Sequence, residues 1–256
     1  MKRIFRVPPN GRAGEDGATA QRLLDAAAHE FALHGFQAGR IRDIVDAAGA
    51  NLAAVNYHFG GKEGLYQATL AHLARRARDE WPFDSPELRA MPPEDQLRAF
   101  VRVMLMRYLG GPKASPLSRI LAHELLDPTP AFGQILKGVS QPQWARLVQI
   151  VRDLLGPRAS EDDVSLATLS TASQWVFFLF GRRMFEAVFP ALATDPDVVD
   201  RLVDHIAFSS IAAMRATRER LEAAPATSRP PRRRAPAEGT EKRRGTAKGE
   251  AKDRRI

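Results

Sequence analysis

Apolar residues in the first 80 positions recur at intervals of three and four, which is the spacing of one helix face. The stripe through residues 24–31 predicts a helix that Thr19 caps and that ends at Gly35. A short helix should follow, with Ile44 and Val45 facing inward, and it should stop near Gly49. This part of the chain therefore begins with one long and one short helix.

A third short helix is predicted over residues 52–58, with Asn51 as its N-cap. The Gly60-Gly61 pair breaks it, and Lys62 begins a longer helix that continues to about residue 80. Two short helices around a tight turn at residues 48–50 have the layout of a helix-turn-helix.

Proline and glycine divide the second half of the chain at regular intervals, again without strand patterns. One helix is expected to be kinked at Pro142, and Ser160 with Asp163 reads as a capping pair for the next. The last two long helices are expected over residues 163–187 and 197–221. The chain is thus predicted to be all-α.

Residues 166–180 are apolar on nearly every side of the predicted helix. A helix of that kind is buried on all faces, and a second copy of the chain could cover part of it. We expect a homodimer whose interface is a four-helix bundle of helices 163–187 and 197–221 from each subunit.

The net charge of +8 is concentrated at one end of the chain. Residues 223–256 hold 11 Lys and Arg against 4 Asp and Glu, so the other 222 residues carry a net charge of only +1. This basic segment has almost no large apolar residue, and we expect it to be disordered. It is either an electrostatic arm that touches DNA or a solubilising appendage.

Cysteine is absent, which excludes disulfides and cysteine-based zinc sites. The longest apolar run, residues 175–180, is far shorter than the roughly 20 residues of a membrane span, and no run of signal-peptide type follows the first residues. We expect a soluble cytoplasmic protein without a catalytic constellation, a metal site or a cofactor.

The side chains predicted to point outward from the third helix suit DNA. Asn56 can pair bidentately with adenine, while Tyr57 and His58 can donate hydrogen bonds to phosphate. Lys62 stands at a helix start, where a phosphate is also favoured. Taken alone, Tyr57 and His58 could equally be packed core residues.

The run AGANLAAVNYHFGGKEGLY, residues 48–66, resembles the signature of the TetR family of transcriptional regulators. The form NYHFGGKE and the later run HELLDPTP, residues 123–130, resemble the CerR/CecR-type subgroup. The resemblance implies an all-helical homodimer with a recognition helix at 52–58, and it favours DNA contact for Tyr57, His58 and Lys62. The chain departs from the family at Gly39-Arg40, where hydroxyl residues are usual; Gly39 could still cap the second helix, and Arg40 or Arg42 could bind the phosphate.

These considerations give a domain plan and two sets of candidate residues. The plan is a flexible basic arm at 1–18, a DNA-binding domain at 19–66 with a connector helix to about 80, a ligand-binding and dimerisation domain at 81–222, and the tail at 223–256. The candidate DNA-binding residues are Arg40, Arg42, Asn51, Ala53, Asn56, Tyr57, His58 and Lys62. The candidate ligand-binding residues are Met104, Tyr108, His123, Trp144, Trp175 and Phe178, for which ordinary core packing is the alternative.

His123-Glu124 lacks the second histidine of a zinc-protease helix and is expected to be a surface or pocket-lining pair. The expected partners are double-stranded DNA, a small-molecule effector and a second copy of the chain, without a membrane. The expected function is a repressor that an effector releases from a near-palindromic operator. An activator, an effector-independent repressor and an architectural DNA-binding protein that uses the tail are the alternatives.

Overall fold

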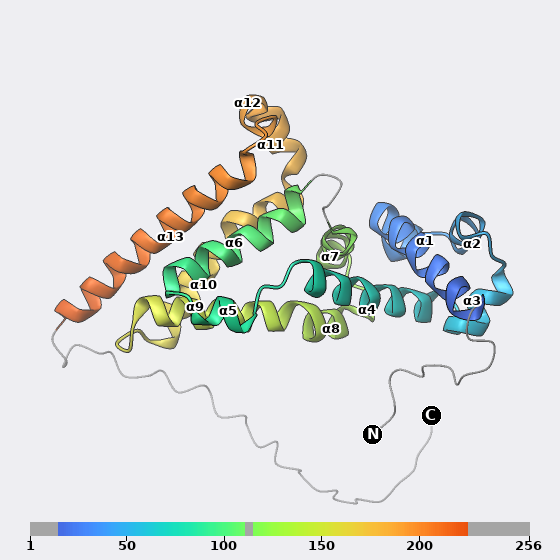
Figure 1. The fold of residues 1–256 in the computed structure, drawn as a ribbon, viewed down its shortest axis with the longest axis horizontal. Helices are drawn as coiled ribbons and strands as arrows, with labels where there is room; N and C mark the ends of the chain where they lie inside the picture. Colours follow the sequence, from blue (N-terminus) through green and yellow to red (C-terminus); the bar gives the residue numbers. More distant parts are fainter. Residues whose placement is uncertain (1–14, 111–114, 225–256) are drawn as a thin grey trace, which may run out of the picture. The chain divides into compact units, whose positions relative to one another are not determined.

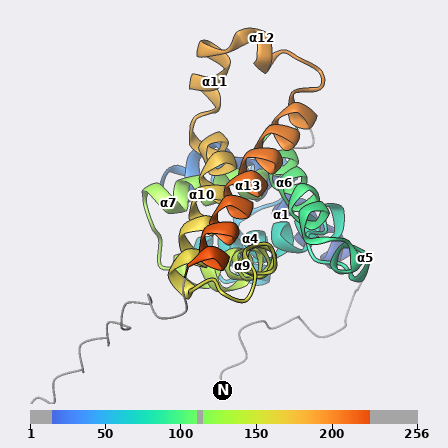
Figure 2. The same cartoon turned by 90° about the vertical axis from the view of Figure 1, so that its left-hand side faces the viewer.

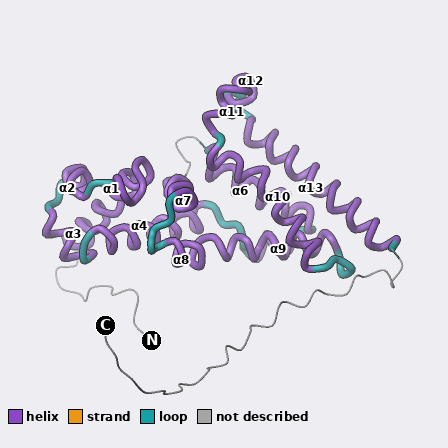
Figure 3. Tube along the Cα trace, turned by 180° about the vertical axis from the view of Figure 1, so that it is seen from behind, coloured by secondary structure: helices purple, strands orange, loops and turns teal. Residues whose placement is uncertain are grey.

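The computed structural model describes residues 15–110 and 115–224, and in these ranges all regular structure is helical (Figures 1 and 3). The predicted all-α class is confirmed. The expected arm at 1–18 and tail at 223–256 lie almost wholly outside the described residues. The helices are α1 (Glu15–Ala38), α2 (Ile41–Ala48), α3 (Leu52–Phe59), α4 (Lys62–Glu80), α5 (Pro86–Ala90), α6 (Pro93–Leu109), α7 (Pro116–Leu126), α8 (Phe132–Ile135), a π-helical turn (Leu136–Ser140), α9 (Gln141–Leu155), α10 (Glu161–Phe180), α11 (Arg182–Val188), α12 (Pro190–Ala193) and α13 (Val198–Ala223).

Helices α1 to α4 form a small bundle that we call the head. Its core buries the apolar stripe of α1 together with Ile44 of α2, Val55 of α3 and Leu65 of α4. Helix α1 already begins at Glu15, so the prediction that Thr19 caps it was wrong. A non-helical residue does interrupt α1 at Gly35, as predicted, where φ is 69°.

The head core also contains residues from beyond α4. Leu117 and Ile120 of α7, and Ala131 and Ile135 at α8, belong to the same buried cluster as the α1 stripe. Helix α7 packs along α1 and also contacts α4. Helices α7 and α8, which follow α6, therefore pack against the head and are not confined to the C-terminal part of the fold.

The second core lies among α6, α9, α10 and α13, which Figure 2 shows running side by side. It includes Met104, Leu147, Trp175 and Ile206, all buried. Charged pairs join the outer faces of α6 and α13, namely Arg98–Asp204, Arg102–Asp200 and Glu94–Arg215. We call this group of helices the C-terminal bundle.

One predicted helix end was wrong. Helix α10 ends at Phe180, not at residue 187, and α11 leaves it at an angle of 85°. Gly181 marks the bend because a Cβ atom there would meet the Phe177 ring and carbonyl at 2.7–2.9 Å. At Pro142, α9 continues from α8 through a π-helical turn, so the proline, which has no N–H to donate, lies next to an interruption of the regular α-helical hydrogen bonds. The kink expected at Pro142 stays a prediction.

The capping predictions were better. Ser160 and Asp163 form a complete capping box at the start of α10, with Ser160 Oγ accepting from the Asp163 N–H at 3.1 Å. Asp163 in turn accepts from the Ser160 N–H at 2.9 Å. The capping box is thus formed within four consecutive residues, and Arg152 of α9 adds hydrogen bonds to Glu161 at the same helix start.

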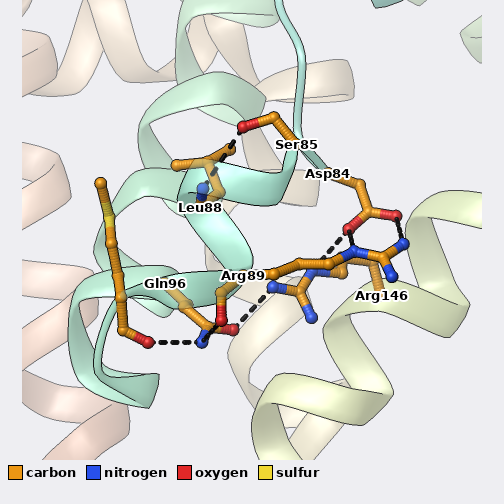
Figure 4. Close-up of polar contacts among 7 residues, drawn as sticks. Asp84, Ser85, Leu88, Arg89, Gln96 and Arg146 are labelled. Carbon is orange, nitrogen blue, oxygen red and sulfur yellow. Dashed lines mark hydrogen bonds and ion pairs between the residues drawn. The ribbon is translucent and has the colours of Figure 1, made fainter.

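A polar network holds the segment between α4 and α6 (Figure 4). Arg89 binds both carboxylate oxygens of Asp84 at 2.7 and 2.6 Å, and Arg146 of α9 approaches the same carboxylate at 3.1 Å. Hydrogen bonding from Arg89 is the main reason that the pKa of Asp84 is lowered. Gln96 donates to the carbonyls of Arg89 and Met91, which closes the segment onto α6. The connection between head and C-terminal bundle is therefore ordered rather than loose.

Across residues 15–110 and 115–224, no single helix has the length and apolar character needed to cross a membrane. Helices α10 and α11 pass that test only when they are taken together across their bend.

Candidate nucleic-acid interface

Helix α3 presents one face to the head core and the other to solvent. Val55 is buried, whereas Leu52, Ala53, Asn56 and Tyr57 are exposed. Tyr57 is 74% exposed, so the alternative that it is a packed core residue was wrong. A helix that fixes one face and leaves the other free is the shape that the major groove accepts.

The turn that leads into α3 depends on two local devices. Gly49 adopts a left-handed conformation, with φ of 58°, and ends α2. Asn51 caps α3 as predicted, because its side chain accepts a hydrogen bond from the Ala54 N–H at 2.9 Å. Asn51 is thus first of all a structural residue, and its predicted DNA contact would have to use its amide donors.

Sequence reasoning missed Arg22, which fixes this turn from outside. Its Nε donates to the Ala48 carbonyl at the end of α2 at 3.0 Å, and its Nη2 donates to Thr19 Oγ1 at 3.2 Å. A cation at the C-terminal end of a helix also suits the helix dipole. No local pattern signals this role, because Ala48 is 26 residues away along the chain.

At the start of α2, the N-cap is Arg40 and not Gly39. A Cβ atom on Gly39 would meet the Gly35 carbonyl and the Phe31 ring at 2.8 Å, so this position requires glycine for close packing. The Arg40 N–H donates to Glu30 at 3.0 Å. The side chains of Arg40 and Arg42 are both exposed at this helix start, where they are free to approach a phosphate.

Lys62 and His58 lie where α3 meets α4. Lys62 Nζ donates to the Gln37 carbonyl at 3.2 Å and stands 4.8 Å from the centre of the Phe36 ring. Burial is the main cause that lowers the pKa of this lysine. Lys62 therefore ties α4 to the end of α1, and its phosphate contact stays a prediction. The His58 ring packs between Tyr57 and Phe59, at 4.9 and 6.0 Å between ring centres.

Three of the six predicted ligand-binding residues share one cavity. Met104, Trp144 and Trp175 line it, with Phe100, Gln143 and Leu147. Its volume is about 30 Å³, which suits roughly one water molecule and not the several hundred Å³ of a typical ligand site. The cavity is thus too small to hold an effector in this conformation.

The other three predicted ligand-binding residues lie outside this cavity lining. Phe178 is buried against Phe185, with ring centres 5.2 Å apart. Tyr108 packs on the C-terminal core, and burial raises its pKa. His123 lies beside Gly35 of α1, since a Cβ atom at that glycine would be 3.2 Å from the imidazole.

The prediction for Glu124 was wrong. It is only 1% exposed and accepts a hydrogen bond from the Tyr66 hydroxyl at 2.5 Å. No group of His, Asp and Glu within the described ranges could hold a metal ion. The sequence hint was the tyrosine on the inner face of α4, which needed a polar partner once buried.

Arg107 was also missed. It is buried on α6, and its Nη2 donates to the carbonyls of Ala77 and Trp81 at 3.1 and 2.9 Å, at the C-terminal end of α4. Its guanidinium also lies 5.5 Å from the centre of the Phe83 ring. Burial lowers the pKa of Arg107 to about 10, so the group remains charged at neutral pH.

Comparison with known proteins matches two consecutive parts of the chain to two family models. Residues 23–77 match the family described as bacterial regulatory proteins of the tetR family. Residues 93–214 match the C-terminal domain of the HTH-type transcriptional dual regulator CecR.

Individual relatives agree with these matches. CecR of Shigella flexneri is 28% identical over 63% of this chain and 76% of its own length. The uncharacterized HTH-type transcriptional regulator TtgW of Pseudomonas putida is 33% identical over 45% of this chain and 81% of its own. A solved structure of a protein from Mesorhizobium loti, described as a TetR-family transcriptional regulator, shares the fold with a TM-score of 0.55 at 19% identity, over 81% of this chain and 98% of that one.

The exposed face of α3, the capped turn before it and the two adjoining family matches have one common explanation: the chain belongs to the TetR family of DNA-binding transcriptional regulators.

Proposed function

We propose that this protein is a dimeric repressor that binds a near-palindromic operator and is released by a small-molecule effector. The observation that carries the proposal is the exposed face of α3, with Asn56 and Tyr57 held outward by the Asn51 cap and the buried Val55. In the dimer, the two α3 helices would enter major grooves about 34–36 Å apart, one helical turn of DNA. It would act in the cytoplasm, without an enzymatic activity.

The proposed dimer interface follows from apolar side chains that the chain itself leaves uncovered. They recur at helical spacing along α10, and α13 exposes one more large apolar residue. Apolar area of this extent on one face is typical of an interface. The exposed residues are Leu166, Leu169, Phe177 and Phe180 of α10, and Phe208 of α13.

The proposed response to an effector rests on α6. This helix lines the small cavity with Phe100 and Met104, and one turn further on it holds the end of α4 through Arg107. A ligand that enlarges the cavity would shift α6, and α6 would shift α4 and the head. If the effector binds more tightly when the head is in a position that does not fit DNA, it weakens DNA binding. DNA then weakens effector binding by the same factor.

The sign of regulation is tested with a reporter gene behind the operator. If the protein is a repressor, it lowers reporter output in cells, and the output rises again when its gene is deleted. The Shigella flexneri relative is named a dual regulator, and a rise in output on expression would replace repression by activation.

Asn56→Ala is expected to relax the operator preference at one position in each half-site. A bidentate contact between asparagine and adenine contributes about 1–3 kcal/mol of discrimination against other bases. Site selection with the wild-type and substituted proteins measures the change. Gln149→Ala removes an exposed amide on α9 and is the matched control, which should select the wild-type site. If Asn56→Ala selects the same site with equal stringency, Asn56 reads no base.

A further inference from the structure

The buried contact between α4 and α7 is a polar joint of three residues: Tyr66, Glu124 and Thr129. Glu124 Oε1 accepts from the Tyr66 hydroxyl at 2.5 Å and from Thr129 Oγ1 at 2.8 Å. Glu124 Oε2 accepts from the Thr129 N–H at 3.1 Å. All three residues are buried, and the joint connects the head with the segment that leads from α7 to α8.

A buried carboxylate with only neutral hydrogen-bond donors is costly to place in a protein interior. Burial, and then the hydrogen bond to Glu124, raise the pKa of Tyr66. Its hydroxyl therefore stays protonated and donates a hydrogen bond to the carboxylate. Loss of one donor would leave part of the charge unsatisfied. Such a group contributes little to the free energy of unfolding. It does restrict how α4 and α7 can be placed relative to each other, because hydrogen bonds are directional.

The joint lies at the place where a rotation of the head would begin. The Tyr66 ring packs edge-on against Phe31, with ring centres 4.9 Å apart, and also against Phe36, so it moves with the core of the head. Next to Glu124, His123 lies against the Gly35 break in α1. His123 therefore meets the head at the break in α1, and Glu124 meets it at Tyr66 of α4.

Leu117 and Ile120 of α7 are buried in the core of the head, but apolar packing leaves room beside the polar joint. A second cavity of about 30 Å³ adjoins the joint, with Tyr66, Gln67, Glu63 and Thr129 among its lining residues. Where side chains leave such room, they allow small rotations, and the hydrogen bonds determine which angle is held.

We propose that the Tyr66–Glu124–Thr129 joint fixes the angle of the head on α7 and thereby sets which half-site spacing the dimer accepts. The inference rests on the proposed function, since spacing has a meaning only for a dimer on two half-sites. Glu124 and Tyr66 are positioning residues in this scheme, because they act through α4 and α3 and do not touch DNA.

The test varies the spacing of the operator. Binding of the wild-type protein and of Tyr66→Phe is measured on operators whose half-sites are moved together or apart in steps of one base pair, each about 3.4 Å along the duplex. The wild-type protein should bind one spacing sharply. Tyr66→Phe should bind that spacing more weakly, and it should bind the neighbouring spacings almost as tightly as the preferred one. The ratio of affinities between preferred and neighbouring spacings should fall by about tenfold, the scale of one hydrogen bond to a charged group.

Thr69→Val is the matched control. It also removes a buried hydroxyl from α4, but that hydroxyl donates at 2.7 Å to the Leu65 carbonyl within the same helix and joins nothing to α7. It should keep the sharp spacing preference even if it lowers the melting temperature. A purely structural role for Tyr66 would lower affinity on all spacings alike.

A second variant is needed if circular dichroism shows that Tyr66→Phe folds poorly. Glu124→Gln keeps the size of the side chain and one acceptor, and it should flatten the spacing preference in the same direction. A sharp, unchanged preference in the folded variants would overturn the joint. Failure of the wild-type protein to bind any pair of half-sites would instead overturn the proposed function.

Discussion

Phe208→Glu is expected to convert the dimer into a monomer that remains folded. Phe208 is 72% exposed on α13, so the change removes little packing within the chain. In the proposed interface it would bury an unpaired carboxylate among apolar residues, which is strongly unfavourable. Light scattering should report half the mass, and operator affinity should fall on the order of 100-fold or more, because two linked half-site contacts become one.

Leu126→Glu is the matched control for this substitution. Leu126 is just as exposed, but it is the last residue of α7 and belongs to neither helix of the proposed interface. It should remain dimeric and bind the operator normally. A dimer that survives Phe208→Glu with unchanged affinity would remove α13 from the interface. Phe178 of α10 would be a poor probe of the interface, because it is buried against Phe185.

Gly64→Ala is expected to abolish specific DNA binding. A Cβ atom at this position of α4 would overlap the carbonyl oxygen of Phe59, the last residue of α3. Backbone atoms cannot yield as a flexible side chain can, so α3 and α4 must separate and the recognition face must turn. Overpacking of this kind costs about 1–3 kcal/mol and occasionally more. Gel-shift titration and a thermal melt measure the two effects.

Gly17→Ala provides the comparison. Gly17 lies in α1, and an added Cβ would have no neighbour within 4 Å. Alanine is favoured over glycine inside a helix by about 1 kcal/mol, so this variant should be equally or slightly more stable and bind DNA as before. Normal operator binding by Gly64→Ala would show that the junction between α3 and α4 tolerates a larger side chain and does not orient the recognition face.

The features that sequence predicted well are those that neighbouring residues determine. The Asn51 cap, the left-handed turn at Gly49 and the capping box of Ser160 and Asp163 each need only a few consecutive residues. The exposed face of α3 followed in the same way from the run at residues 48–66. Such local signals do not depend on where the rest of the chain lies.

Apart from the N-caps expected at Thr19 and Gly39, the failures concern partners far apart in sequence or the response of the backbone to packing. Glu124 looked like a surface residue because its donor, Tyr66, is 58 positions away. The end of α10 at Phe180 depends on how closely the Phe177 ring approaches Gly181. The ligand cavity could be predicted only as a group of large side chains, since their packing decides whether any volume remains between them.

Selection of bound fragments from random and genomic DNA tests the central claim most directly. The purified chain should enrich one motif with two inverted half-sites about one helical turn apart, and footprinting should show protection on both. Enrichment of fragments without a shared motif, with affinity that follows only length and salt concentration, would contradict the account, because an exposed α3 would then read no sequence.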